Sequence, residues 1–174
     1  CDKSIGDGGG ISIRRARLIF SGKLTDKISF YIQPDLASTI GTNTHVLQLR
    51  DAYIDLGFDK MQTFRLRLGQ SKIPFGFENI QSSSNRISLD RADGINVHLP
   101  NERDVAGIFY YTPPRVTLLF DRLLKEGLKG SGNYGLFAFG VFNGETANKV
   151  SRNNQLYVVS RLTYPFEWKS QIVE

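Results

Sequence analysis

Apolar and polar residues alternate with a period of two along much of the chain, which is the spacing of a β-strand with one apolar and one polar face. In residues 50–58, for example, Ile54 and Leu56 fall on one face while Asp51 and Asp55 fall on the other. Seven segments follow this pattern with varying regularity: residues 11–20, 28–37, 50–58, 64–71, 105–111, 134–142 and 155–164. The pattern predicts an all-β chain with antiparallel strands.

The connections between these segments fall into two length classes. Residues 21–27 and 59–63 are short enough for turns, whereas residues 38–46, 72–104 and 143–154 are long. Each strand segment also has about the length that a tilted strand needs to cross roughly 30 Å of hydrocarbon. Short turns at one rim and long loops at the other are typical of a transmembrane β-barrel. A soluble β-sandwich is the alternative, and it does not require this asymmetry.

The polar faces of the predicted strands carry a mixture of arginine, aspartate and tyrosine. Barrel interiors that enclose water are polar in this way. The other interpretation is that these are solvated arginines on the wet face of an ordinary sheet. The residues concerned are Arg15, Arg17, Tyr31, Asp51, Tyr53, Asp55, Arg65, Arg67 and Arg161.

Residues 112–133 do not fit the strand pattern. Pro113 and Pro114 indicate a turn, and the apolar residues that follow permit either a short amphipathic helix or an additional hairpin. Residues 1–10 are rich in glycine and are expected to form a flexible segment. Cys1 could be the acylated first residue of a mature lipoprotein or simply the first residue of the segment.

Composition excludes several classes of protein. Of the 174 residues, 40% are hydrophobic, and 22 Lys and Arg face 17 Asp and Glu, which gives a formal net charge of +5. One cysteine cannot form a disulfide scaffold or a four-cysteine zinc site. The apolar content is too high for intrinsic disorder. No apolar stretch approaches the roughly 18 residues of a membrane-spanning helix.

Several motifs in one order resemble the phosphate-selective porin O and P family of bacterial outer-membrane proteins. The central one is Leu68-Gly69-Gln70-Ser71-Lys72-Ile73-Pro74-Phe75-Gly76-Phe77-Glu78. The others are Arg14-Arg15-Ala16-Arg17-Leu18, Arg50-Asp51-Ala52-Tyr53-Ile54-Asp55, Leu89-Asp90-Arg91, Glu102-Arg103-Asp104-Val105 and Gly140-Val141-Phe142-Asn143-Gly144. Together they extend over most of residues 12–164.

The resemblance implies an antiparallel transmembrane β-barrel of about sixteen strands, of which this chain supplies about seven or eight. Residues 11–174 would form a partial barrel within a longer polypeptide, with residues 72–104 as a long loop that can fold into the lumen. A homotrimer in contact with outer-membrane lipid is also implied. In this family the constriction uses an adjacent arginine pair, which falls on Arg14 and Arg15, and a later arginine, which falls on Arg91. Ser29 and Asn79 stand where phosphate-specific members have lysines, and Arg50 stands where they have an acidic residue.

The predicted function is a porin that passes small anions such as phosphate by passive diffusion. The candidate anion-binding and pore-lining residues are Arg14, Arg15, Arg17, Asp51, Asp55, Arg65, Arg67 and Arg91. A non-selective or sugar-passing porin and a plugged barrel with a structural or receptor role remain alternatives. The sequence shows no enzyme or cofactor motif. A metal site is not expected, because His45 and His98 lack the spacing of metal ligands. Nucleic-acid binding is not expected either, because the basic residues alternate along the predicted strands and do not cluster in a patch.

Overall fold

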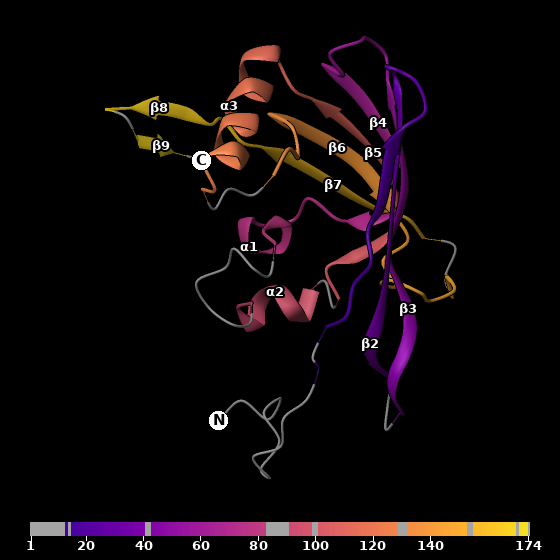
Figure 1. Ribbon diagram of the computed structural model, residues 1–174. Helices are drawn as coiled ribbons and strands as arrows, with labels where there is room; N and C mark the ends of the chain where they lie inside the picture. The colour runs from indigo at the N-terminus through magenta and orange to yellow at the C-terminus, as the bar shows by residue number, and fades with distance from the viewer. Residues whose placement is uncertain are drawn as a thin grey trace.

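The computed structural model describes residues 13, 15–40, 43–82, 91–98, 101–128, 132–152, 155–169 and 171–173. Seven strands form one antiparallel sheet in which each strand pairs with the next in sequence (Figure 1). These strands are β1 (Phe20–Lys23), β2 (Ile28–Ile40), β3 (Asn43–Gly57), β4 (Phe64–Lys72), β5 (Arg103–Tyr111), β6 (Phe137–Phe142) and β7 (Tyr157–Leu162). A separate hairpin joins β8 (Phe166–Trp168) to β9 (Gln171–Val173). The prediction of an antiparallel all-β fold is confirmed.

The β2–β3 hairpin is longer than the sequence pattern predicted. Residues 38–46 were expected to form a loop, but β2 continues to Ile40 and β3 begins at Asn43. Near this end the two strands pair only with each other, because β3 meets β4 only from Ala52 onward. A two-stranded ribbon has no sheet face to bury, so its sequence need not alternate. The predicted loop was therefore wrong.

The first strand is also displaced from its predicted position. Residues 11–20 were expected to form it, whereas β1 begins at Phe20 and takes up part of the predicted turn 21–27. In residues 15–19 the only pairing is an isolated bridge between Arg17 and Asp35. Leu18 and Ile19 are both exposed although they are adjacent, so no face of this segment is selectively buried. Residues 1–10 lie outside the described residues.

Three helices lie on the concave side of the curved sheet (Figure 1). Helices α1 (Phe77–Ile80) and α2 (Asp93–His98) lie between β4 and β5, and α3 (Pro114–Lys125) connects β5 to β6. The segment that permitted either a helix or a hairpin thus contains a helix. No helix in the described part of the chain combines the length and apolar character needed to cross a membrane.

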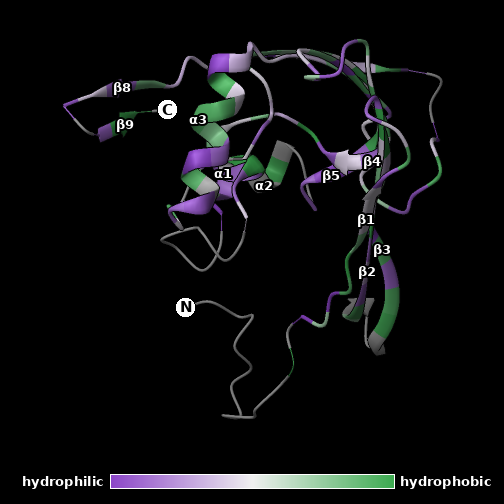
Figure 2. Cartoon of the chain, turned by 45° about the horizontal axis from the view of Figure 1, so that its top comes forward, coloured by the Kyte–Doolittle hydropathy of each residue, from purple (hydrophilic) through white to green (hydrophobic). Residues whose placement is uncertain are grey.

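Helix α3 has one apolar and one charged side (Figure 2). Val116, Phe120 and Leu123 recur at helical spacing, are buried and pack with Leu136 and Ile172. Proline is favoured at the first helical position, which Pro114 occupies, because that position needs no amide donor. The helix is therefore fixed against the connection that leads into β6 and against the β8–β9 hairpin.

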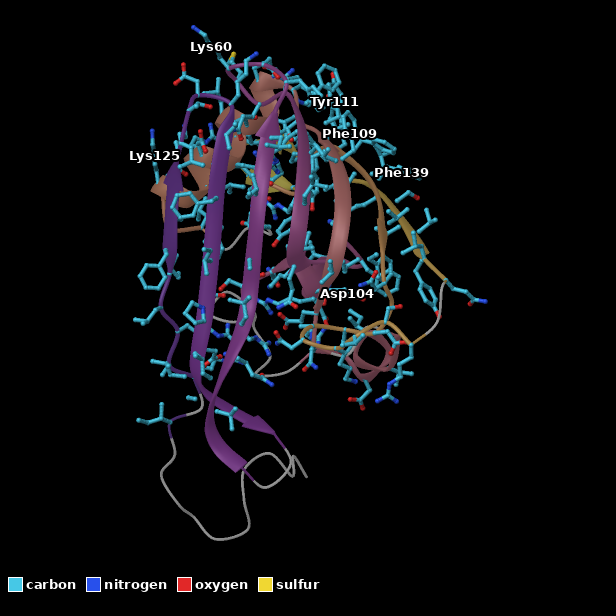
Figure 3. All side chains as sticks on the ribbon, turned by 90° about the vertical axis from the view of Figure 1, so that its right-hand side faces the viewer. Lys60, Asp104, Phe109, Tyr111, Lys125 and Phe139 are labelled. Atoms are coloured by element: carbon cyan, nitrogen blue, oxygen red, sulfur yellow. The ribbon has the colours of Figure 1, made fainter. Side chains whose placement is uncertain are left out.

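The convex face of the sheet is apolar and exposed (Figure 3). Within the described residues no second sheet is stacked on it, which is the arrangement that a β-sandwich requires. Ile54 remains 45% exposed and Phe139 47% exposed although both belong to strands of the sheet. The other exposed apolar residues of this face include Ile32, Phe64, Leu68, Val105, Val141 and Val158.

An aromatic cluster, defined as Phe58, Phe64, Phe109 and Tyr111, lies on this face beside the β3–β4 turn. The ring centroids of Phe64 and Tyr111 are 5.1 Å apart, and those of Phe64 and Phe109 are 6.1 Å apart. Phe58 and Phe109 follow at 6.4 Å. Such rings are typical of the level at which a membrane protein meets the lipid headgroups.

Candidate functional site

The opposite, concave face carries polar residues and encloses a cavity of about 560 Å³. Strands β2 to β5 supply most of its wall, and the rest comes from α1 and Ser82 just after it, from the residue before β5, and from the segments before β1 and before β6. Its lining consists of Arg15, Arg17, Tyr31, Gln33, Arg50, Asp51, Tyr53, Arg65, Arg67, Lys72, Ile80, Ser82, Glu102, Arg103, Gly132, Asn133 and Tyr134. Seven of these side chains are basic and two are acidic.

Arg67 is held tightly at the centre of β4. Its Nε and Nη2 donate hydrogen bonds of 2.8 Å to the two carboxylate oxygens of Asp55 on β3. The guanidinium group lies 3.8 Å from the ring centroid of Tyr53 and 5.4 Å from that of Tyr110. Tyr53 in turn stacks on Tyr31 with ring centroids 5.3 Å apart. Paired and enclosed in this way, Arg67 contributes positive charge to the wall while its donors are largely used by the protein.

Arg65 occupies the next inward position of β4. Its Nη2 donates a 2.9 Å hydrogen bond to the carbonyl oxygen of Asn133, and its Nε lies 3.9 Å from Asp55. The guanidinium group also lies 4.9 Å from the ring centroid of Tyr110. Asp55 therefore serves two arginines. The backbone contact fixes the segment before β6 against the sheet.

A second cluster surrounds Arg103 where β5 begins. Arg103 Nε donates hydrogen bonds of 3.0 Å to both carboxylate oxygens of Asp51, and its Nη1 donates one of 2.8 Å to Glu102. Glu102 also lies 3.5 Å from Lys72 Nζ and 3.4 Å from Arg91 Nε. Three cations therefore share the Glu102 carboxylate. The cluster links β3, β4 and β5 to the segment between α1 and α2.

Asn79 anchors that segment. It is fully buried, and its Nδ2 donates a 2.7 Å hydrogen bond to the carbonyl oxygen of Ile73. Arg91 Nη1 donates a 2.7 Å bond to Asn79 Oδ1, and Lys72 Nζ donates one of 2.6 Å to the carbonyl oxygen of Gln81. Asn79 is one of the two residues that stand where lysines are expected. Here its hydrogen bonds hold this segment in place. The other, Ser29, lies in β2 beside a smaller cavity.

The segment before β1 is fastened through Arg17. Arg17 Nε donates a 2.8 Å hydrogen bond to Asp35, which also accepts bonds from the backbone amides of Ala16 and Ala37. Arg15 lines the cavity from the same segment and is more exposed.

Arg50 enters the cavity because of an irregularity in β3. The register places Gln33 opposite Asp51 and Pro34 opposite Leu49, so Arg50 is an extra residue in a β-bulge. In a regular strand, the neighbours Arg50 and Asp51 would point to opposite faces. Here both line the cavity. Strict alternation places Arg50 on the same face as Ala52 and Ile54, so the predicted site does not include it. A period of two cannot reveal a bulge.

The structure brings most of the predicted site residues together. Arg15, Arg17, Asp51, Arg65 and Arg67 line the cavity, and Asp55 lies directly behind the two β4 arginines. Arg91 does not line the cavity but pairs with the lining residue Glu102, and Arg14 lies outside the described residues. Sequence reasoning placed Tyr31 and Tyr53 on the polar face but missed the contributions of Arg50, Arg103 and Tyr134. Whether any of these residues binds an anion stays a prediction.

The sign of the charge decides what such a wall can attract. Counting Asp35 and Asp55, which pair with lining arginines, four carboxylates face the seven basic side chains. The excess of positive charge favours anions. Guanidinium groups suit oxyanions in particular, because they stay protonated and present a planar set of donors.

The chain was compared with known protein families, curated proteins and solved structures. Residues 1–171 match the protein family described as phosphate-selective porin O and P. No curated protein and no solved structure matches the chain.

Proposed function

This chain belongs to the phosphate-selective porin O and P family, and we propose that it forms part of the wall of a passive channel that prefers small anions. Proteins of this family are outer-membrane porins. Beyond this family assignment, we propose that the permeating solutes are negatively charged, and that they include phosphate and similar oxyanions. It also includes a homotrimeric assembly.

The observation that carries the proposal is the opposite character of the two faces of one sheet. The convex face offers exposed apolar side chains and the aromatic cluster, as a lipid-facing surface does. The concave face offers a water-accessible cavity with an excess of basic side chains. A wall with lipid on one side and an electropositive, hydrated surface on the other supports an anion-preferring channel.

Conduction requires that an anion be attracted but released. A wall of fully free arginines would bind an oxyanion tightly and slow its passage. In this chain Arg67 and Arg103 are paired with Asp55 and Asp51, so their charge acts on a solute through a partly neutralised field. The paired carboxylates therefore lower the affinity at each position while the net sign remains positive.

The reversal potential in a salt gradient tests the proposal. Full-length protein is incorporated into a planar bilayer with KCl at tenfold different concentrations on the two sides. An anion-preferring channel gives a reversal potential whose sign corresponds to chloride permeation. Replacing chloride by phosphate shows whether oxyanions pass. A potential of the opposite sign would show cation preference and overturn the proposal.

A second candidate is a plugged barrel with a structural or receptor role. The position of α1, α2 and α3 on the concave side favours it, because this is the side that would face the lumen of a barrel (Figure 1). Zero conductance from a folded full-length barrel, together with a normal shift in gel mobility on heating, would support this alternative over the channel.

A further inference from the structure

Among the described residues that line the cavity, Arg50 differs from the other cations in that its guanidinium group has no hydrogen-bond or ion-pair partner. Arg17, Arg65, Arg67, Lys72 and Arg103 each lie within 4 Å of a carboxylate oxygen. Within the described part of the chain, the guanidinium group of Arg50 makes no hydrogen bond or ion pair, and its Nε is buried without a partner. Burying an N–H donor such as Nε without a hydrogen-bond partner is costly, whereas the rest of the side chain lines the cavity.

The charges around Arg50 increase this cost. Arg103 and Arg17 are the charged groups that act on it most strongly, and both have the same sign as Arg50. Glu102 and Asp35 act in the opposite direction, but each already has its own cationic partner. The site around Arg50 is therefore short of negative charge. An anion that entered the cavity would supply what the protein does not.

The bulge that presents Arg50 is held in place by side chains. Gln70 Nε2 on β4 donates hydrogen bonds to the carbonyl oxygens of Leu49, at 2.6 Å, and Arg50, at 3.0 Å. Asn148, from the connection between β6 and β7, donates a backbone bond of 3.0 Å to Gln70 Oε1 and a side-chain bond of 2.9 Å to the carbonyl oxygen of Leu49. Two other segments thus fix the backbone on either side of Arg50. A cation on a fixed backbone binds with a smaller loss of conformational entropy.

We propose that Arg50 is a binding site for a small oxyanion, of the class of phosphate, sulfate or carboxylate. The inference rests on the proposed channel function and adds a residue that occupies the position where an acidic residue was expected. The fork of the guanidinium group matches two oxygens of one oxyanion, whereas chloride accepts without this geometry. The cavity of about 560 Å³ has ample room for such an ion with its water. Because it opens on the face opposite the apolar one, the ligand comes from the aqueous phase.

Direct binding of inorganic phosphate tests this site without requiring conduction. Full-length protein in detergent is titrated with phosphate by calorimetry, as wild type and as Arg50→Gln, Arg50→Lys and Lys60→Gln. Lys60 lies in the exposed β3–β4 turn (Figure 3), so its replacement removes the same charge away from the cavity. Far-UV circular dichroism and gel mobility before heating check that every variant is folded.

Arg50→Gln is expected to weaken phosphate binding about tenfold or more. Arg50→Lys keeps the charge without the fork and should give an intermediate affinity, and Lys60→Gln should match the wild type. Equal affinity of Arg50→Gln and wild type, an equal loss in Lys60→Gln, or no phosphate binding by the wild type would each overturn the inference. Conductance is scored separately. A protein that binds phosphate through Arg50 but does not conduct would keep the site and refute the channel.

Discussion

Arg67 and Asp55 lie directly opposite each other in the β3–β4 register and join through two hydrogen bonds of 2.8 Å. Their side chains are 7% and 8% exposed. A buried pair of this kind has little net effect on stability while it is complete, but the loss of one partner leaves the other charge buried and unpaired. The pair therefore makes the lumenal charge of this region dependent on correct folding of both strands.

Asp55→Asn should destabilise the fold by about 3 to 5 kcal/mol, because Arg67 stays buried without its counter-charge. The measurement is the urea midpoint of the full-length protein in lipid vesicles. Asp121→Asn, an exposed position on α3, is the control and should change the free energy of unfolding by less than about 0.5 kcal/mol. Equal effects of the two variants would contradict a structural role for the pair.

Gly69→Ala should also destabilise, since Gly69 has φ of +124° and a β-carbon there would collide with the carbonyl oxygen of Ala52 and lie 2.9 Å from the α-carbon of Tyr53. A loss of about 1 to 3 kcal/mol is expected from the backbone conformation alone. Gly94→Ala in α2 is the matched control, because no atom lies within 4 Å of its added carbon. The same unfolding measurement would contradict the argument if Gly69→Ala were neutral.

Asp104→Asn should loosen the connection between β6 and β7. The buried Asp104 accepts hydrogen bonds from the backbone amides of Val105, Gly144 and Thr146, and an amide nitrogen in place of one oxygen would face donors. Limited trypsin digestion, followed by mass spectrometry, should show faster cleavage after the exposed Lys149 and Arg152.

Asp121→Asn again serves as the control for that digestion and should leave the cleavage rate of the β6–β7 connection unchanged. An unchanged rate in Asp104→Asn as well would mean that the connection is held by other contacts, such as those of Asn148 with Gln70 and Leu49.

Phe139→Arg places a charge on the convex face and should hinder insertion into lipid vesicles. A basic residue on the lipid-facing side of a strand costs about 2 to 4 kcal/mol near the middle of the bilayer. Val150→Arg, in the exposed β6–β7 connection, adds the same charge outside the sheet and should have little effect. The yield of protease-protected protein gives the comparison. Equal yields would show that the convex face does not contact lipid.

The sequence predicted the strands whose two faces differ in environment. Strands β3 and β4 lie within the sheet. Apolar residues such as Ile54 occupy its convex face and polar residues such as Arg67 its concave face, so apolar and polar residues alternate along each strand. The far end of the β2–β3 hairpin is a two-stranded ribbon, and for this segment the sequence pattern predicts a loop. For residues 112–133 the sequence left a helix and a hairpin open, and the spacing of Val116, Phe120 and Leu123 behind Pro114 favours the helix α3 that the structure has.

Alternation along the strands predicted which residues lie on the concave face. It did not predict which of them form ion pairs with one another. Parity placed Arg65 and Arg67 beside Asp55 without revealing that one carboxylate serves both arginines. Arg103 and Lys72 meet at Glu102 only after the chain has passed through α1 and α2, a distance in sequence that no local pattern spans. The bulge at Arg50 depends on Gln70 and Asn148, which come from two other segments.

The aromatic cluster at Phe64 and Tyr111 has a consequence for the surrounding membrane. Hydrogen-bonded strands resist stretching, so the protein fixes the height of the apolar, lipid-facing belt of the sheet beyond these rings. Lipids whose tails are longer or shorter than that belt must compress or extend around it, and this hydrophobic mismatch costs about a fraction of a kcal/mol for each ångström. The protein would then select acyl-chain length in its immediate neighbourhood.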